Sequence, residues 1–203
     1  KIIDTSNNGE LIPETLLSEH GLDTGAEIIV NQDGSFAVST TDSINTFVTT
    51  VTIPPLISTY DLGERAPYFT TSPLIEGGFV ATWEETNGGG GNIVFQLFDA
   101  SGQPSSNKIT VNADTDTHVP TIAQLENGSI VVAWQQYVNG YRETQYKIFD
   151  ENFVSSDLKV ASQAPNDDHI DTKIVDLRDG SFLITASKVD NFPGMDGFGK
   201  SIR

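Results

Sequence analysis

A repeat with a spacing of 51 residues restricts the fold of this chain more than any other sequence feature. The following identical residues lie 51 positions apart: Leu74 and Leu125, Trp83 and Trp134, Asp99 and Asp150, and His118 and His169. A looser copy of the repeat follows, with Leu177 at 52 positions from Leu125. Repeats of this length are typical of solenoids and propellers, in which each unit is one supersecondary element.

Within each unit the apolar residues alternate with polar ones, and Val, Ile, Thr and Phe are frequent. This period of two predicts β-strands, because successive side chains of a strand point to opposite faces. In one unit the expected strands are Tyr68–Leu74, Phe79–Trp83, Ile93–Phe98 and Ile109–Asn112. Four short strands in each unit favour a propeller blade.

The clearest hairpin of the repeat is TIAQLENGSIVVAW, which spans Thr121–Trp134. Its Asn127-Gly128 pair predicts a two-residue type I′ turn, in which both central residues need a positive φ. At the position that it has in the repeat, the hairpin is expected to form the inner half of a blade. Trp134 and Val131–Val132 are then expected in the core between blades.

The sequence therefore predicts one all-β domain, a β-propeller-like fold of about four four-stranded antiparallel blades. A β-sandwich or a fragment of a larger propeller remains an alternative. The expected segments are 1–25 (an N-terminal strand and a short helix), 26–62 (blade 1), 63–113 (blade 2), 114–164 (blade 3) and 165–203 (an incomplete blade 4). The helix is expected at Leu11–His20, with Pro13 in its first turn. The strand Lys1–Ile3 is expected to complete the last blade and so remove an open edge.

The charge of the chain limits its partners. Among 203 residues there are 28 acids and 11 bases, which gives a formal net charge of -17. Such a chain repels nucleic acid and anionic membranes, so neither is an expected partner. The longest clearly apolar run, Ile130–Trp134, is too short to cross a membrane, and no signal peptide opens the sequence. There is no cysteine, which excludes disulfides and thiolate metal sites. Because the first residue is not Met, we expect a mature or excised piece of a longer protein.

The repeat has a recognisable pattern in its best copy. The residues that carry it are Pro120, Ala123, Leu125, Asn127, Gly128, Val131, Val132 and Trp134, and in the preceding copy Leu74, Gly77, Gly78, Phe79, Val80, Trp83, Phe98, Asp99, Gly102, Val111 and Asn112. This pattern resembles the repeat of large secreted bacterial proteins of the RTX, hemolysin-type adhesin class. The resemblance implies a modular protein that is extracellular or at the bacterial cell surface.

The sequence departs from that class at several points. The Gly of the Phe-Asp-x-x-Gly segment is missing after Phe149-Asp150, where Glu151, Asn152 and Phe153 follow. Ala186 stands where the last copy would have its Trp. The calcium-binding nonapeptide of RTX proteins is also absent, so the resemblance does not by itself imply calcium.

Three irregular segments are expected on one face of the propeller: Glu84–Asn92, Gln135–Arg142 and Lys188–Gly197. Varied loops on a rigid scaffold often carry binding residues, and Tyr and Arg favour contact with a glycan or a peptide. The candidate ligand-binding residues are Glu85, Tyr137, Tyr141, Arg142, Phe192 and Met195. The alternative is that some of these side chains only pack on neighbouring loops.

Acidic residues precede the first strands of two units, beside His118 and His169. Carboxylate oxygens are calcium ligands, so the candidate metal ligands are Asp114, Asp116, Asp167, Asp168 and Asp171, with Ca²⁺ as the cofactor. The equivalent positions of the two His residues favour a packing or hydrogen-bonding role instead, which would tie each crossing segment to its blade. No His spacing indicates a transition-metal site.

Catalytic signals are weak. No nucleophile motif is present, and the sequence predicts no catalytic residue. Glu84 and Glu85 are expected to be exposed to solvent, because Gln135 and Gln136 stand at the equivalent positions. The favoured hypothesis is a non-catalytic binding or scaffold module that holds a glycan or protein ligand on the loop face. The alternatives are a carbohydrate-active enzyme that uses carboxylates of that face, and a structural unit that self-assembles through open blade edges. The sequence leaves the oligomeric state open.

Overall fold

The structure is a computed structural model, and it describes residues 2–4, 9–12, 26–30, 35–41, 45–51, 57–62, 66–86, 91–114, 117–138, 141–162, 168–189 and 200–201. These residues form strands and turns, with no helix among them. No helix that is long and apolar enough to cross a membrane occurs in this part of the chain.

The strands form four main antiparallel sheets, each built from strands that are consecutive in the sequence. Sheet 1 contains β3 (Ala26–Val30), β4 (Phe36–Thr41), β5 (Thr46–Val51) and β6 (Ile57–Asp61). Sheet 2 contains β7 (Thr70–Pro73), β8 (Phe79–Thr86), β9 (Gly91–Phe98) and β10 (Ile109–Asn112). Sheet 3 contains β11 (Thr117–Gln124), β12 (Ile130–Val138), β13 (Tyr141–Phe149) and β14 (Lys159–Ser162). Sheet 4 contains β15 (Asp168–Asp176), β16 (Phe182–Val189) and β17 (Lys200–Ser201).

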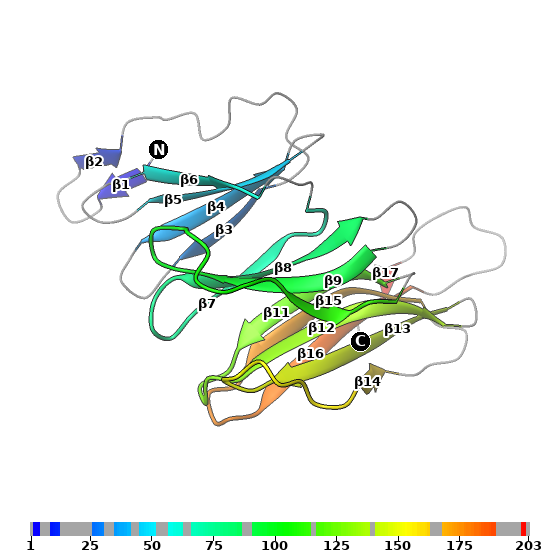
Figure 1. Ribbon diagram of the computed structural model, residues 1–203. Coiled ribbons are helices and arrows are strands. Elements are labelled where there is room, and N and C mark those ends of the chain that lie inside the picture. The colour runs from blue at the N-terminus through cyan, green and yellow to red at the C-terminus, as the bar shows by residue number, and fades with distance from the viewer. Residues whose placement is uncertain are drawn as a thin grey trace.

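The four sheets follow one another in chain order, from the blue sheet 1 to the orange hairpin of sheet 4 (Figure 1). Their first strands lie next to one another, since β3 contacts β7, β7 contacts β11 and β11 contacts β15. Successive four-stranded sheets with neighbouring first strands are the arrangement of propeller blades. The predicted all-β, propeller-like fold is confirmed.

The hydrophobic core lies between the sheets. One cluster joins sheets 1 and 2 and contains Trp83, which stacks on Phe69 at 5.8 Å between ring centroids. A second cluster joins sheets 2 and 3 and contains Trp134 and Val132. Val131 lies on the opposite face of its strand and is also fully buried. The prediction that these residues belong to the core between blades is confirmed for Trp134 and Val132, whereas Val131 is buried but belongs to neither cluster.

The hairpin turn of sheet 3 differs from the predicted type I′ turn. Gly128 has a φ of 84°, but Asn127 is not among the residues with positive φ. The Gly128 N–H donates to the Leu125 carbonyl at 2.8 Å, and the Leu125 N–H donates to the Ser129 carbonyl at 2.8 Å. These bonds define a three-residue loop that ends in a left-handed glycine, the next most common hairpin after the two-residue type.

The Phe-Asp turn keeps its form where its glycine is missing. Gly102 has a φ of 78°, and Phe153, 51 positions later, adopts a φ of 61°. In both turns the carboxylate of the Asp accepts two backbone N–H groups: Asp99 from Ser101 and Gln103, and Asp150 from Asn152 and Val154. Phe153 also lies edge-on to Phe95 at 5.9 Å between centroids. The Asp hydrogen bonds and this ring contact hold a phenylalanine in a backbone conformation that suits glycine.

The N-terminal segment differs from the expected closing strand. Strand β1 (Ile2–Asp4) pairs with β2 (Gly9–Ile12) in a two-stranded sheet of its own. Sheet 4 has three described strands, and its third strand is β17 rather than β1. Leu11 lies in β2, so a helix cannot begin there; residues 13–25 of the expected N-terminal segment lie outside the described residues.

Candidate functional site

A cavity of about 690 Å³ lies between the first strands of the four sheets. Residues of β3, β7, β11 and β15 line it, together with residues of the turns that follow the last three of these strands. We call it the axial cavity. Its walls are extended strands paired in sheets, so the backbone that positions the lining side chains is held by ladder hydrogen bonds.

The lining combines polar and aliphatic side chains. Hydroxyl groups come from Thr70, Thr71, Ser72 and Thr121. Aliphatic surface and ionisable groups come from Ile28, Ile29, Ile75, Ile122, Ile174 and Val175, and from Glu126, Lys173, Asp176 and Arg178. A mostly preformed concavity with a few polar groups beside apolar surface is the usual form of a small-ligand site.

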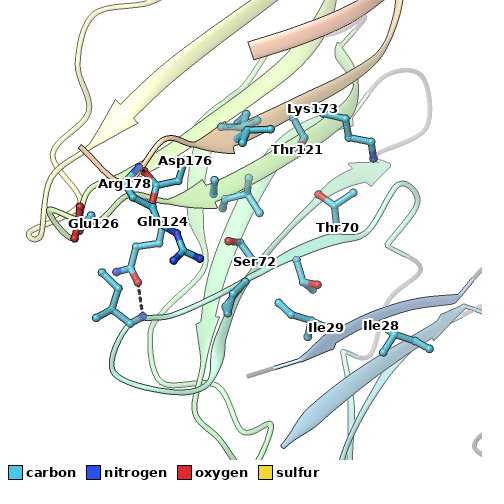
Figure 2. Close-up of a pocket in the computed structure, with 17 residues that line it drawn as sticks. Ile28, Ile29, Thr70, Ser72, Thr121, Gln124, Glu126, Lys173, Asp176 and Arg178 are labelled. Carbon is cyan, nitrogen blue, oxygen red and sulfur yellow. Dashed lines mark hydrogen bonds between the residues drawn. The ribbon is translucent and has the colours of Figure 1, made fainter. Parts of the chain in front are cut away.

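The two kinds of side chain are separated along the cavity. Figure 2 shows Gln124, Glu126, Asp176 and Arg178 together at one side, while Ile28 and Ile29 lie at another. The first group comes from the ends of β11 and β15 and the turns after them. A ligand in this cavity therefore meets charged and amide groups at one side and hydrocarbon at another.

Hydrogen bonds between sheets 2 and 3 fix part of the wall. The Ile75 N–H donates to Gln124 Oε1 at 2.8 Å, and Gln124 Nε2 donates to the Gly128 carbonyl at 3.3 Å (Figure 2 draws the first bond). Thr70 Oγ1 donates to the Pro120 carbonyl at 3.2 Å. In sheet 4, Asp176 Oδ1 accepts the Arg178 N–H at 3.1 Å. Gln124, Thr70 and Asp176 thus hold the shape of the cavity as well as lining it.

Three residues of the predicted loop face lie in strands. Strands β12 and β13 continue to the pair Val138 and Tyr141, so residues 135–138 and 141–142 of the expected irregular segment lie in strands, and residues 139–140 lie outside the described residues. Tyr137 is 43% exposed, and the Arg142 guanidinium carbon lies 5.7 Å from the centroid of its ring. The Nε of Arg142 is buried and has no hydrogen-bond partner. The structure thus brings Tyr137 and Arg142 together, with Tyr141 at the start of the same strand as Arg142.

Of the other predicted ligand-binding residues, only Glu85 is described, and it lies away from the lining of the axial cavity. Glu85 lies on β8 and forms an ion pair with Lys108, and neither residue lines the cavity. Phe192 and Met195 lie outside the described residues.

The predicted calcium ligands are described only in part. Asp114 is exposed after the end of β10, and its N–H donates to Asn112 Oδ1 at 3.4 Å. Asp168 and Asp171 lie in β15, whereas Asp116 and Asp167 lie outside the described residues. No group of three or more metal-ligating side chains occurs among the residues searched, which are the described ones. Calcium binding stays a prediction.

One buried carboxylate was expected to be exposed. Glu84 is only 4% exposed, and its Oε2 lies 3.3 Å from Nδ1 of His118 on β11 of the next sheet. Gln135 and Gln136, at the positions equivalent to Glu84 and Glu85, are also buried. The expectation of solvent exposure for Glu84 is wrong. Strand β8 continues past Trp83 and β12 continues past Trp134, and the residues that directly follow each Trp are still buried. His118 makes a polar contact as expected, but with Glu84 of sheet 2 rather than within its own blade, so the contact ties sheet 3 to sheet 2.

Sequence comparisons and structure comparisons give different results. No protein-family model and no curated protein matches the sequence. Among solved structures, the endo-arabinase from Bacteroides thetaiotaomicron VPI-5482 is similar, with a TM-score of 0.50 and 12% sequence identity. The match covers 84% of this chain and 70% of that enzyme. That enzyme has a propeller fold, so the similarity supports the propeller-like arrangement of the sheets.

Proposed function

We propose that this chain is a non-catalytic carbohydrate-binding module and that the sugar occupies the axial cavity. The observation that carries the proposal is the lining of that cavity, in which hydroxyl, amide and charged groups adjoin aliphatic surface. A sugar presents hydroxyls along its ring edge and C–H groups on its faces. Such a cavity can form hydrogen bonds with the sugar hydroxyls and apolar contacts with the C–H faces of the ring.

The setting of the cavity supports the same proposal. Its volume of about 690 Å³ lies within the roughly 300–1,000 Å³ of small-ligand sites. The wall residues stand on paired strands, so little conformational entropy is lost when a ligand binds. The cavity differs from the loop face that the sequence indicates, where Tyr137 and Arg142 already contact each other.

We propose further that the module belongs to a secreted or cell-surface bacterial protein of adhesin type. The support is the resemblance of the repeat and the net charge of -17, which disfavours nucleic acid and anionic lipid as partners. The natural ligand would then be a glycan outside the cell that carries the module.

A titration with a panel of soluble oligosaccharides tests the binding function. The name of the similar enzyme makes arabinan oligosaccharides the first members of the panel, beside xylan, mannan and pectin fragments. We expect calorimetric binding of at least one glycan by the full chain. An empty panel, repeated with millimolar calcium present, would contradict the proposal.

Two lysine variants locate the site. Lys173 lines the cavity and is an exposed residue, whereas Lys159 is exposed on β14 at the outer edge of sheet 3. Lys173→Met keeps most of the length of the side chain and removes its charge. We expect it to weaken glycan binding about tenfold or more, as the loss of a charged hydrogen bond does. Lys159→Met is the matched control and should bind as the unchanged chain does. Equal binding by both variants would place the sugar elsewhere.

Two carboxylates on the wall of the cavity favour a second candidate function, glycoside hydrolysis. Glu126 and Asp176 both line it, and glycosidases use a pair of carboxyl groups. The Asp176 carboxylate already accepts a hydrogen bond from the backbone N–H of Arg178. Because this bond assigns the carboxylate a structural role in its turn, we place this candidate second. Release of reducing ends from the panel, abolished by Glu126→Gln, would establish it. Binding without any release would leave the non-catalytic function.

A further inference from the structure

Three equivalent leucines differ sharply in their exposure to solvent. Leu74 and Leu125, which directly follow the first strands of sheets 2 and 3, are 9% and 3% exposed. Leu177, at the same position of sheet 4, is 51% exposed. The cluster that buries Leu74 contains Ile122 and Trp134 of sheet 3. Each leucine is therefore buried when another sheet follows its own, and no sheet of the described residues lies over Leu177.

The cross-strand pair beside each leucine behaves in the same way. In sheet 3, Ala123 lies opposite Val131, and both side chains are buried. In sheet 4 the equivalent pair is Val175 and Leu183, and each is about half exposed. Leu177, Val175 and Leu183 form one exposed apolar face, which we call the sheet 4 face. Alternation along β15 and β16 places it on the side away from Phe182, whose ring contacts Tyr146 of sheet 3.

Sheet 1 carries the complementary surface. Ile29 of β3 packs in the cluster between sheets 1 and 2, so its neighbours Ile28 and Val30 point to the other side. These two side chains are 67% and 64% exposed. We call them the sheet 1 face. Within the described residues β15 contacts β11, and it has no comparable contact with β3. Ile28 of the sheet 1 face and Val175 of the sheet 4 face both line the axial cavity, so the two faces open on that cavity and do not pack against each other within one chain. A second copy bound at these faces would therefore border the proposed sugar site.

We propose that the sheet 4 face binds the sheet 1 face of a second copy of this chain. Each interface between the described sheets joins the following side of one sheet to the preceding side of the next. Among the described residues the two exposed faces have no partner in that pattern, so head-to-tail association continues an interface that already exists three times. Such a contact is heterologous, because different surfaces of the two copies meet.

The charge of the chain gives this association a distinctive salt dependence. Two copies with a net charge of -17 each repel one another, and salt screens that repulsion. Apolar contact does not weaken with added salt in the same way. We expect tighter association at about 0.5 M than at about 0.05 M NaCl, where the Debye length is several ångströms longer. Association through ion pairs would show the reverse order.

Sedimentation velocity of the full chain over a range of concentrations tests the proposal. Leu183→Glu places a charge on the sheet 4 face, and Val30→Glu places one on the sheet 1 face. Each variant alone should associate at least about tenfold more weakly, because a charge would have to be buried without a partner. Val154→Glu is the matched control: Val154 is also strongly exposed, on the segment between β13 and β14, and the change should leave association intact.

Mixing the two variants gives the decisive result. The Leu183→Glu chain keeps an intact sheet 1 face, and the Val30→Glu chain keeps an intact sheet 4 face. A one-to-one mixture should therefore recover dimers and no larger species, which also shows that both variants are folded. The proposal is overturned if the unchanged chain stays monomeric at every concentration, if Val30→Glu associates normally, or if the mixture recovers nothing.

Discussion

At the scale of single residues, alanine substitutions at two glycines distinguish the cost of a left-handed backbone from the added cost of a steric clash. Gly78 and Gly128 have φ values of 78° and 84° in equivalent hairpin turns. A Cβ on Gly128 would meet nothing within 4 Å, whereas a Cβ on Gly78 would lie 2.2 Å from the Phe98 carbonyl oxygen. Gly128→Ala should lower the free energy of unfolding by about 1–2 kcal/mol, the cost of the left-handed conformation. Gly78→Ala should cost about 1–3 kcal/mol more because of the clash. Urea unfolding measures both, and equal losses would contradict the structure of this turn.

Asp99 makes stability depend on pH. Partial burial acts to raise the pKa of Asp99, but hydrogen bonds from the Ser101 hydroxyl and from the N–H groups of Gln103 and Ser101 bring it below its ordinary value of 3.8. A carboxyl group whose pKa is depressed by folding stabilises the folded state above the unfolded pKa, and this stabilisation is lost as the pH falls through the folded pKa.

Asp99→Asn should therefore be less stable than the unchanged chain at pH 7, and the difference should shrink as the pH falls below about 4. Asp157→Asn is the control, since Asp157 is also an exposed carboxylate beside a repeat turn. Unfolding by urea at several pH values checks both variants. If the free energy of unfolding of Asp99→Asn differed from that of the unchanged chain by the same amount down to pH 2, the carboxylate charge would not contribute to stability.

The residues that line the axial cavity were not predictable from the sequence. Thr70, Thr121 and Lys173 look like ordinary strand residues, and they become a site only because first strands of different sheets lie side by side. The sequence directed attention to aromatic and charged residues in expected loops instead. Glu84 was misjudged for a related reason, because burial depends on the neighbouring sheet that supplies His118.

At the scale of the elements, a tryptophan on the second strand anchors sheet 2 to sheet 1 and sheet 3 to sheet 2. Trp134 is fully buried between sheets 2 and 3. Trp134→Ala should lower the free energy of unfolding by about 3–5 kcal/mol, the usual cost of deleting a large core side chain. Leu158→Ala, at a half-exposed position before β14, should change it by less than about 0.5 kcal/mol. A small loss for Trp134→Ala would mean that sheets 2 and 3 do not share this core.

The strands were predictable because their alternation is strong, but their ends were not. The hairpin of β11 and β12 was expected at Thr121–Trp134, whereas β11 begins at Thr117 and β12 ends at Val138. The added residues include His118, Gln135 and Gln136, which are polar and gave no strand signal. Their pairing across the sheet, for example His118 with Gln135, makes them strand residues despite their composition.

At the scale of the whole molecule, the repeat predicted the number and order of the sheets, because each copy carries its own hairpin and core tryptophan or its replacement. Closure was not predictable in the same way. The expected closing strand Lys1–Ile3 overlaps β1, which pairs with β2 instead. Closure depends on contacts between the first and last sheets, and no local pattern in the sequence reports such contacts.

The location of a bound sugar tests the central claim, that the first strands of the sheets form a carbohydrate site. Hydrogen–deuterium exchange of the full chain should be measured with and without the panel glycan that binds best. We expect slower exchange in peptides that cover β7, β11 and β15, whose residues line the axial cavity, and no change in β14. Protection confined to residues 84–92 and 135–142, or no protection anywhere, would contradict the claim.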